Sequence, residues 1–453
     1  MVRSRIRNLS PILAILASLG AGCVAVYPAS GLRAEPRSNA QSPSAPATPR
    51  PETPASAGSD APADPMSDRW PARWGVAGAP RGVIVPSETP VAALRPAHLG
   101  RFHHLRTGEI EYRQAEALAR AVGVDDGFRF VPEGPGSLVF MPPLEAEPAD
   151  APDPAGRAEA ESFVFISAQT TPESTTDDPR VAIERTWMAL YDAETPEPNG
   201  TIVLIPGMLG TPQPIIEGMV RYWRNRGYAV LRLLSHPSRF TERVEVAIAP
   251  GEERAAAGQL AQIYDQRTAE CAYAADAGLD HVFARRPALA EKPVVLVGMS
   301  GGAMVLPTVY AYAPERYDAA VLIAGGLNFL KISALSNYAD WIDAIVLDWD
   351  PSDPDSKVQP TPERLDRLSN AYLAASRLDA AHTAGELADV PVLMLHATKD
   401  KAVPSETGDA LWRLLGTPER WVFPVGHEII FVMLPTQGQR LTDWIDNATG
   451  AEP

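Results

Sequence analysis

Beyond residue 160 the chain alternates short apolar runs with stretches of helical periodicity. Eight apolar runs have the length and composition of buried strands, at residues 163–167, 181–193, 201–205, 228–234, 294–299, 319–323, 392–396 and 421–423. Strands that alternate with helices form a mostly parallel sheet, because the helices connect strand to strand and cover both faces. The pattern therefore predicts an α/β fold with a mostly parallel eight-stranded sheet flanked by helices.

Two helical patterns are clear between these strands. The stretch after Pro214 places its large apolar side chains on one face and stops at Gly227, where a left-handed residue can end a helix. A longer stretch, 252–283, connects the fourth predicted strand to the fifth. Both are predicted to be helices that pack on the sheet.

An insertion, residues 327–387, interrupts the alternation after the sixth predicted strand. It contains helical pieces and many apolar and aromatic residues, including Trp341 and Trp349. Ligands bind to such sheets at the carboxyl ends of the strands, where an insertion at this point stands. We expect a helical cap, with part of its apolar surface packing it onto the domain and the remainder lining a ligand pocket.

The residues before this pattern form a Pro-rich N-terminal extension. Fifteen of the 45 prolines of the 453-residue chain lie in its first 100 residues, among Ala, Ser and Thr. Residues 23–69 are therefore predicted to be a tether. Hydrophobic residues return over 70–160, together with one helical pattern at 108–122, but no motif indicates what this part does.

The first 22 residues have the features of an export signal. Three arginines are followed by an apolar run, 12–19, and by small residues before Cys23. The run is too short to span a bilayer, which needs roughly 20 residues. The segment resembles a bacterial lipoprotein signal, which implies removal of residues 1–22, a lipid on Cys23 and a lipid-anchored protein of the cell envelope. An ordinary secretory signal is the alternative, since Gly20 stands where the lipoprotein motif favours Leu.

The net charge of the chain indicates which partners it can bind. The net charge of −16 opposes binding to phosphate backbones, and no basic cluster with interleaved aromatics suggests a local exception, so we expect no nucleic-acid partner.

The only cysteine besides Cys23 is Cys271, within the predicted helix 252–283. We interpret it as a small core residue.

The sequence GMSGG, residues 298–302, is the strongest chemical signal. It directly follows the β-branched run 294–297 and directly precedes a helical pattern, 303–312. A serine on a sharp strand-to-helix turn is exposed as a nucleophile, and the turn leaves no room for side chains two positions before and after it, where Gly298 and Gly302 stand. We predict Ser300 as the nucleophile. The alternative is a glycine-rich turn that carries an inert serine.

A serine nucleophile requires a general base, and two histidines after Ser300 stand near strand ends. His427 follows the last predicted strand, whereas His396 lies within its strand, where a packed histidine is the simpler interpretation. We predict His427 as the base. His103 and His104 are adjacent, but no carboxylate or cysteine completes a ligand spacing, so we predict no metal site.

The base requires a carboxylate that orients its ring. Asp400 follows the seventh predicted strand in a short loop and precedes a Val-Pro pair, so it is the predicted acid. Asp348, Asp350 and Asp353 are rivals, because they follow the sixth predicted strand.

A developing oxyanion requires two preorganised backbone N–H donors. One belongs to the residue after the nucleophile, Gly301, and the other to the loop after the third predicted strand. That loop reads Pro206-Gly207-Met208, and we predict the Met208 amide as the second donor. The alternative is a glycine turn without this role.

These segments together resemble the α/β-hydrolase superfamily over residues 161–448. The resemblance implies a cofactor-independent serine hydrolase that acts through an acyl-enzyme. A carboxylic-ester hydrolase with a small-molecule ester substrate is the leading interpretation. A serine peptidase or amidase is the alternative, and a surface-anchored interaction protein on the same scaffold is a third.

Overall fold

The computed structural model describes residues 81–91, 94–98, 129–131, 133–134, 136–141, 160–171, 174–208, 213–339, 344–351 and 359–451. All of them belong to one compact unit, residues 62–453. No helix in these ranges is both long and apolar enough to cross a membrane. The predicted signal and tether, Cys23, His103, His104, the helical pattern 108–122, Trp341 and Asp353 lie outside the described residues.

All eight predicted strands are present in one sheet. They are β5 (Glu161–Thr170), β6 (Arg180–Tyr191), β7 (Gly200–Ile205), β8 (Tyr228–Leu233), β10 (Val294–Met299), β11 (Ala319–Ile323), β13 (Val392–Ala397) and β14 (Glu419–Phe423). Their order is β5-β6-β8-β7-β10-β11-β13-β14. Neighbouring strands are parallel from β8 to β14, whereas β6 is antiparallel to β5 and to β8. The predicted mostly parallel α/β fold is confirmed, and it is consistent with the α/β-hydrolase fold.

The sheet is wider than predicted, with ten strands in place of eight. The N-terminal extension supplies β1 (Arg81–Ser87), antiparallel to β5, and β3 (Arg129–Val131), parallel to β6. It also forms a separate two-stranded antiparallel sheet, β2 (Arg95–His98) with β4 (Leu138–Met141). Without β1 the long strand β5 would leave a row of unpaired backbone groups at the sheet edge, which is an aggregation hazard. The extension therefore completes the sheet.

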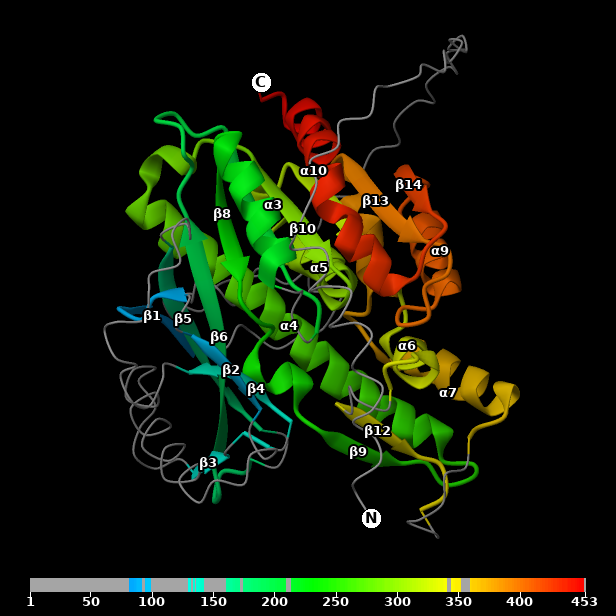
Figure 1. The fold of residues 1–453 in the computed structure, drawn as a ribbon. Helices are drawn as coiled ribbons and strands as arrows, with labels where there is room; N and C mark the ends of the chain where they lie inside the picture. The colour runs from blue at the N-terminus through cyan, green and yellow to red at the C-terminus, as the bar shows by residue number, and fades with distance from the viewer. Residues whose placement is uncertain are drawn as a thin grey trace, which may run out of the picture. The chain divides into compact units, whose positions relative to one another are not determined.

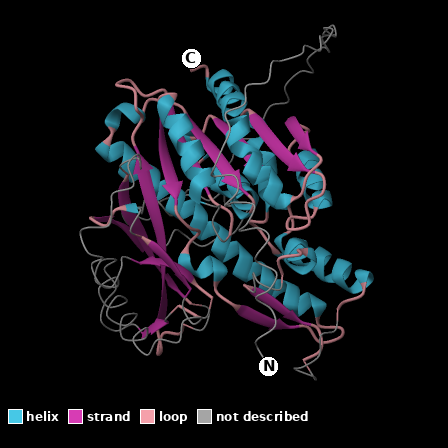
Figure 2. Ribbon diagram, viewed as in Figure 1, coloured by secondary structure: helices cyan, strands magenta, loops and turns pink. Residues whose placement is uncertain are grey.

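Helices cover both faces of the sheet (Figures 1 and 2). The central strands are buried on both faces because α3 (Gln213–Asn225) and α10 (His427–Thr449) pack on one side, and α4 (Glu253–Arg285) and α5 (Gly301–Tyr312) on the other. The helix predicted after Pro214 is α3, and Gly227 follows it with a φ of +84°.

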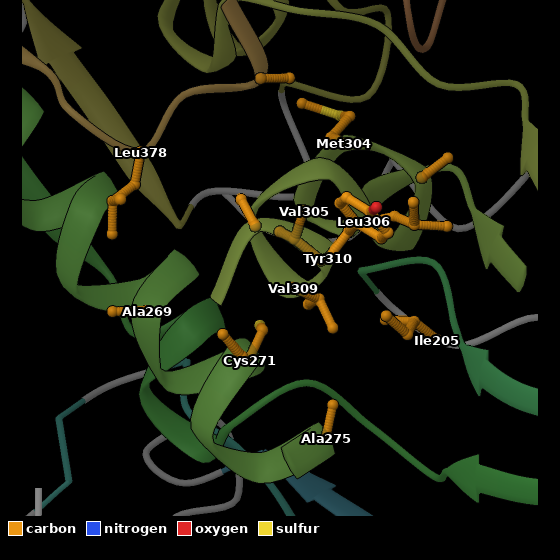
Figure 3. Packing of buried hydrophobic residues seen from close by; sticks show 14 of the residues in the cluster. Ile205, Ala269, Cys271, Ala275, Met304, Val305, Leu306, Val309, Tyr310 and Leu378 are labelled. Atoms are coloured by element: carbon orange, nitrogen blue, oxygen red, sulfur yellow. The ribbon is translucent and has the colours of Figure 1, made fainter. Parts of the chain in front are cut away.

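The core between α4 and α5 contains Cys271 (Figure 3). Its side chain is fully buried, as predicted for a core residue, and Ala275 of α4 and Val309 of α5 belong to the same cluster. Such close packing of small and branched side chains fixes α5 against the sheet. The amino end of α5, which follows Ser300, is thereby held in place.

The insertion is only partly helical. It contains α6 (Phe329–Leu335), α7 (Pro362–Ala375) and α8 (Ala380–Thr383), but also β12 (Ile345–Asp348), which was not predicted. β12 pairs in parallel with β9 (Val244–Ala247) in a two-stranded sheet apart from the main one (Figure 1). Trp349 is buried in the core, with the Arg364 guanidinium 5.0 Å from its ring centre. Two roles were predicted for the insertion's apolar surface, packing onto the domain and lining a pocket. Trp349 has the packing role.

Candidate active site

Ser300 occupies a sharp turn between β10 and α5. Its φ of 53° lies in the left-handed region, which a residue with a side chain rarely adopts. Its backbone N–H donates to the Ile323 carbonyl at 2.8 Å, which ties the turn to the neighbouring strand β11. Such strain at a serine is a feature of the nucleophile turn predicted from the sequence.

The two flanking glycines are required by space. A methyl group on Gly298 would lie 2.6 Å from the Gly302 carbonyl oxygen, and one on Gly302 would lie 2.5 Å from the Pro206 carbonyl oxygen. Both contacts are with backbone, which cannot move aside as a flexible side chain can. The turn therefore excludes every residue but glycine at 298 and 302, as the sequence predicted.

His427 is the first residue of α10 and lies beside Ser300. Its Nε2 is 2.9 Å from Ser300 Oγ, and its Nδ1 is 2.6 Å from Asp400 Oδ2. The imidazole is buried, and so is the carboxylate. The structure therefore brings together the three residues predicted as a catalytic triad. Their catalytic roles remain a prediction.

Asp400 follows β13 and is held by its own loop. Its Oδ1 accepts hydrogen bonds from the backbone N–H groups of Ala402 at 2.9 Å and Val403 at 2.8 Å. Its other oxygen, Oδ2, is thus left for the imidazole. The rivals Asp348 and Asp350 lie at the end of β12 and just after it, in the separate two-stranded sheet.

The bonding pattern selects one tautomer of the imidazole. The Asp400 carboxylate can only accept, so Nδ1–H of His427 donates to it, and Nε2 carries the lone pair. That lone pair faces the Ser300 hydroxyl, which then donates to Nε2. This arrangement can remove a proton from the serine when its oxygen attacks an electrophile.

The predicted oxyanion donors are adjacent to Ser300. The amide of Gly301 belongs to the first turn of α5, where backbone N–H groups have no partner within the helix. A methyl group on Gly301 would lie 3.2 Å from the Met208 backbone nitrogen, and one on Gly207 would lie 3.8 Å from Ser300 Oγ. The segments that carry the two predicted donor amides thus lie next to each other and beside Ser300.

Two residues near the site were not identified from the sequence. Tyr338, from the insertion, meets the His427 ring edge to face, with ring centres 5.9 Å apart, and its hydroxyl donates to the Glu428 carboxylate. Burial and this bond raise the pKa of the Tyr338 hydroxyl far above its usual value. His236 is buried beside Gly301, and burial lowers its pKa to about 4. Neither residue belongs to a recognisable motif, so the sequence contained no signal for them.

His396 has the packed position that the sequence favoured. It is buried in β13, and its Nε2 is 3.0 Å from the Ser405 hydroxyl. Burial lowers its pKa. Within the described ranges, no cluster of three or more His, Cys, Asp or Glu side chains could hold a metal ion.

Comparisons with known proteins give structural similarities of low identity only. No protein-family model matches the sequence, and no curated protein does. An esterase of Pyrococcus furiosus is 12% identical with a TM-score of 0.38, covering 63% of this chain and 92% of its own. Est1E from Butyrivibrio proteoclasticus is 15% identical with a TM-score of 0.39, covering 58% and 95%.

An acylaminoacyl peptidase, in complex with Z-Gly-Gly-Phe-chloromethyl ketone, is 12% identical with a TM-score of 0.40, covering 64% of this chain and 42% of its own. At such TM-scores these similarities assign no activity to the chain.

Proposed function

We propose that the protein is a serine hydrolase that cleaves carboxylic esters through an acyl-enzyme. The observation that supports it best is the continuous hydrogen-bonded series from Ser300 Oγ through His427 to Asp400, built on a strained turn. A strained serine is costly to maintain, and residues held in such a conformation are concentrated at functional sites.

The geometry supports a two-step reaction. Ser300 Oγ attacks the ester carbonyl while its proton passes to His427 Nε2, and Asp400 stabilises the imidazolium that forms. The carbonyl oxygen becomes an oxyanion, which accepts hydrogen bonds from the Met208 and Gly301 amides. The tetrahedral intermediate then expels the alcohol, which takes the proton from His427. Water, activated by the same imidazole, releases the acid from the acyl-enzyme.

The test combines covalent labelling with turnover. The purified protein is incubated with a fluorophosphonate probe, then assayed with p-nitrophenyl esters and with peptide p-nitroanilides. The proposal requires labelling at Ser300 and faster turnover of the esters. Faster turnover of the anilides would identify a peptidase or amidase, and absence of labelling and turnover would identify a non-catalytic interaction protein.

The cap of this hydrolase is proposed to contact the substrate through residues 336–339. This segment reaches the acid loop, where the Asn337 backbone N–H donates to the Lys401 carbonyl at 2.9 Å, and Tyr338 covers the edge of His427. A ring in that position can form one wall of the acyl pocket. Short to medium acyl esters should then be cleaved faster than acetate, since each buried methylene contributes about 0.8 kcal/mol, or roughly fourfold in affinity.

We predict that Tyr338→Ala reduces the preference for butyrate over acetate by at least about fourfold, the contribution of roughly one methylene. Tyr338→Phe keeps the ring and should keep the preference. The measurement is kcat/KM for p-nitrophenyl acetate, butyrate and octanoate. As a matched control, Tyr372→Phe removes a hydroxyl bonded to Asp379 inside the insertion. An identical chain-length profile in wild type and Tyr338→Ala would show that this ring does not line the acyl site.

We also propose that the protein is exported and anchored to a membrane by a lipid on Cys23. The support is the sequence before that cysteine, which resembles a lipoprotein signal. The wild type should partition with membranes and Cys23→Ser should not, because the several acyl chains of a lipoprotein anchor firmly where one chain binds marginally. Recovery of the wild type in the periplasmic or culture fraction would contradict lipidation.

A further inference from the structure

Two buried carboxyl groups lie next to each other between the sheet and α4, outside the triad. Glu184 of β6 is 7% exposed, and Glu270 of α4 is 1% exposed. The Ser167 hydroxyl donates to Glu270 Oε2 at 2.7 Å, and Ser167 stands directly opposite Glu184 in the antiparallel pair of β5 and β6. Residues opposite each other in such a pair share a face, with Cβ atoms about 4.5–5.5 Å apart. Ser167 therefore adjoins both carboxyl groups.

The two carboxyl groups are hydrogen-bonded unequally. Glu270 accepts from the Ser167 hydroxyl through Oε2 and from the Gln169 side-chain amide through Oε1. Oε2 of Glu184 is buried, and no donor among the described residues bonds to it. A buried oxygen that accepts no hydrogen bond costs much more in a carboxylate than in a neutral carboxyl. The hydrogen bonds therefore favour the charged form of Glu270 and the neutral form of Glu184.

The arginines around the pair cannot compensate both carboxylates. Arg185 is paired with Glu133 of the N-terminal extension. Arg239, in the 3-10 helix η4 (Ser238–Thr241), binds the two carboxylate oxygens of Glu242 at 3.1 and 2.9 Å. Among the described residues that face Glu184, the cation left for the pair is Arg267 of α4, whose Nη2 donates to a backbone carbonyl at 2.5 Å. One guanidinium thus stands against two carboxyl groups.

Burial disfavours charge on both members of the pair. It raises the pKa of the Glu184 carboxyl to about 7, against the opposing effects of Arg239 and Arg267. It also raises the pKa of the Glu270 carboxyl well above its usual value, and the charge of Glu184 adds to this effect. Two adjacent carboxyl groups in a medium of low polarity lose their protons in two separate steps, because the first charge opposes the second.

We propose that Glu184 and Glu270 hold one proton between them at neutral pH, and that this proton makes the packing of α4 against the sheet dependent on pH. Its loss places two adjacent anions in the core. α4 also packs on α5, which follows Ser300, and its Glu253 carboxylate binds Arg364 of α7 at 3.0 Å. The helix that would be loosened therefore supports both the nucleophile turn and the insertion. The inference does not depend on the proposed hydrolase activity.

Stability should decrease as the pH rises, because the folded protein binds the proton more tightly than the unfolded chain does. The pKa of Glu184 rises from 4.5 to about 7 on folding. Between these values the unfolded chain has released a proton that the folded protein keeps. The unfolding equilibrium constant should therefore increase by up to about tenfold per pH unit over this window, and the loss should be complete above it.

The experiment is urea unfolding of the full chain from about pH 5 to about pH 9, with Glu184→Gln and Glu270→Gln beside the wild type. Glutamine has the shape of a protonated glutamate, and each variant leaves one carboxylate for Arg267 to compensate. Relative to either variant, the unfolding constant of the wild type should rise about 10- to 100-fold between about pH 5 and about pH 8. Comparison with the variants removes the contributions of the other titrating groups, which all three proteins share.

Glu253→Gln is the matched control. Glu253 is another carboxylate of α4, but its own backbone N–H and the Arg364 guanidinium lower its pKa below the usual value. It is therefore ionised over this pH range in the folded and in the unfolded chain. Its substitution should change stability by the same factor at every pH, so its pH dependence should match that of the wild type.

A measurement on the wild type does not require either variant to fold. A protonated carboxyl has an infrared C=O band that a carboxylate lacks, so the band should be present at about pH 6 and lost at about pH 9. Absence of this band at about pH 6 would overturn the proposal. So would a pH dependence that Glu184→Gln removes and Glu270→Gln preserves, since burial of Glu184 alone would then account for it.

Discussion

Ser300→Ala is expected to reduce ester hydrolysis by roughly 10⁶-fold, the typical loss when a triad nucleophile is removed, while the protein folds as before. The hydroxyl contributes to chemistry through its 2.9 Å contact with His427 Nε2, and the φ of 53° is set by the turn. Alanine at this φ bears about the same backbone strain as serine, so stability should change little. The measurements are kcat/KM for p-nitrophenyl butyrate, fluorophosphonate labelling and the melting temperature.

The chain offers a matched control for this variant. Ser405 also lies beside a buried imidazole, with its hydroxyl 3.0 Å from His396 Nε2. That pair lacks the strained turn, so Ser405→Ala should retain activity and should still label at Ser300. If Ser300→Ala kept even a tenth of the wild-type rate, the nucleophile would be another residue.

The predicted strands agree with the structure to within a few residues because most of them are buried on both faces, the edge strand β14 being the exception. A buried parallel strand must be apolar at nearly every position, and such runs stand out against amphipathic helices. β10 and β11 were predicted with the bounds that the structure shows. The triad positions could be predicted for a related reason: the residues at the carboxyl ends of these strands follow directly from the strand bounds.

The elements that were missed depend on pairing between distant segments. β12 has only four residues, and all of them are partly exposed, so no apolar run marks it. It forms a strand because β9, about 100 residues earlier in the chain, offers a free edge. β3 likewise has three residues and exists through β6. Local composition does not contain such information, since the stabilising bonds come from the partner strand.

The residues of the site divide in the same way, into those predicted from local sequence and those that depend on tertiary contacts. Ser300, His427 and Asp400 are each preceded by a strand that indicates where the side chain will be. Tyr338 and His236 come close to the site through tertiary packing, from an insertion and from a loop edge. Their residue types have many uses in proteins, so only coordinates distinguish these positions from ordinary buried rings.

Asp400→Asn is expected to lower kcat by about 10⁴-fold without unfolding the protein, as an aspartate-to-asparagine change does at the equivalent place in a serine protease triad. The measurements are kcat, the melting temperature and fluorophosphonate labelling. Asp379→Asn is a control for buried aspartates, because Asp379 accepts bonds from the Asn328 and Phe329 backbone N–H groups at 2.9 Å and takes no part in the site. It should lower stability and leave kcat unchanged. Inactivation by Asp348→Asn or Asp350→Asn instead would place the acid after the sixth predicted strand.

The size of the expected loss follows from how Asp400 is held. Its Oδ1 accepts from the Ala402 and Val403 amides, so an asparagine must keep its carbonyl oxygen there and turn its NH₂ group toward His427. The NH₂ group can only donate, which forces Nδ1 to accept and moves the ring proton to Nε2. The imidazole then points an N–H at Ser300 where it needs a lone pair, and it cannot take the serine proton. The two loop amides therefore let asparagine fit at this position, but its NH₂ group holds the His427 ring in the wrong tautomer.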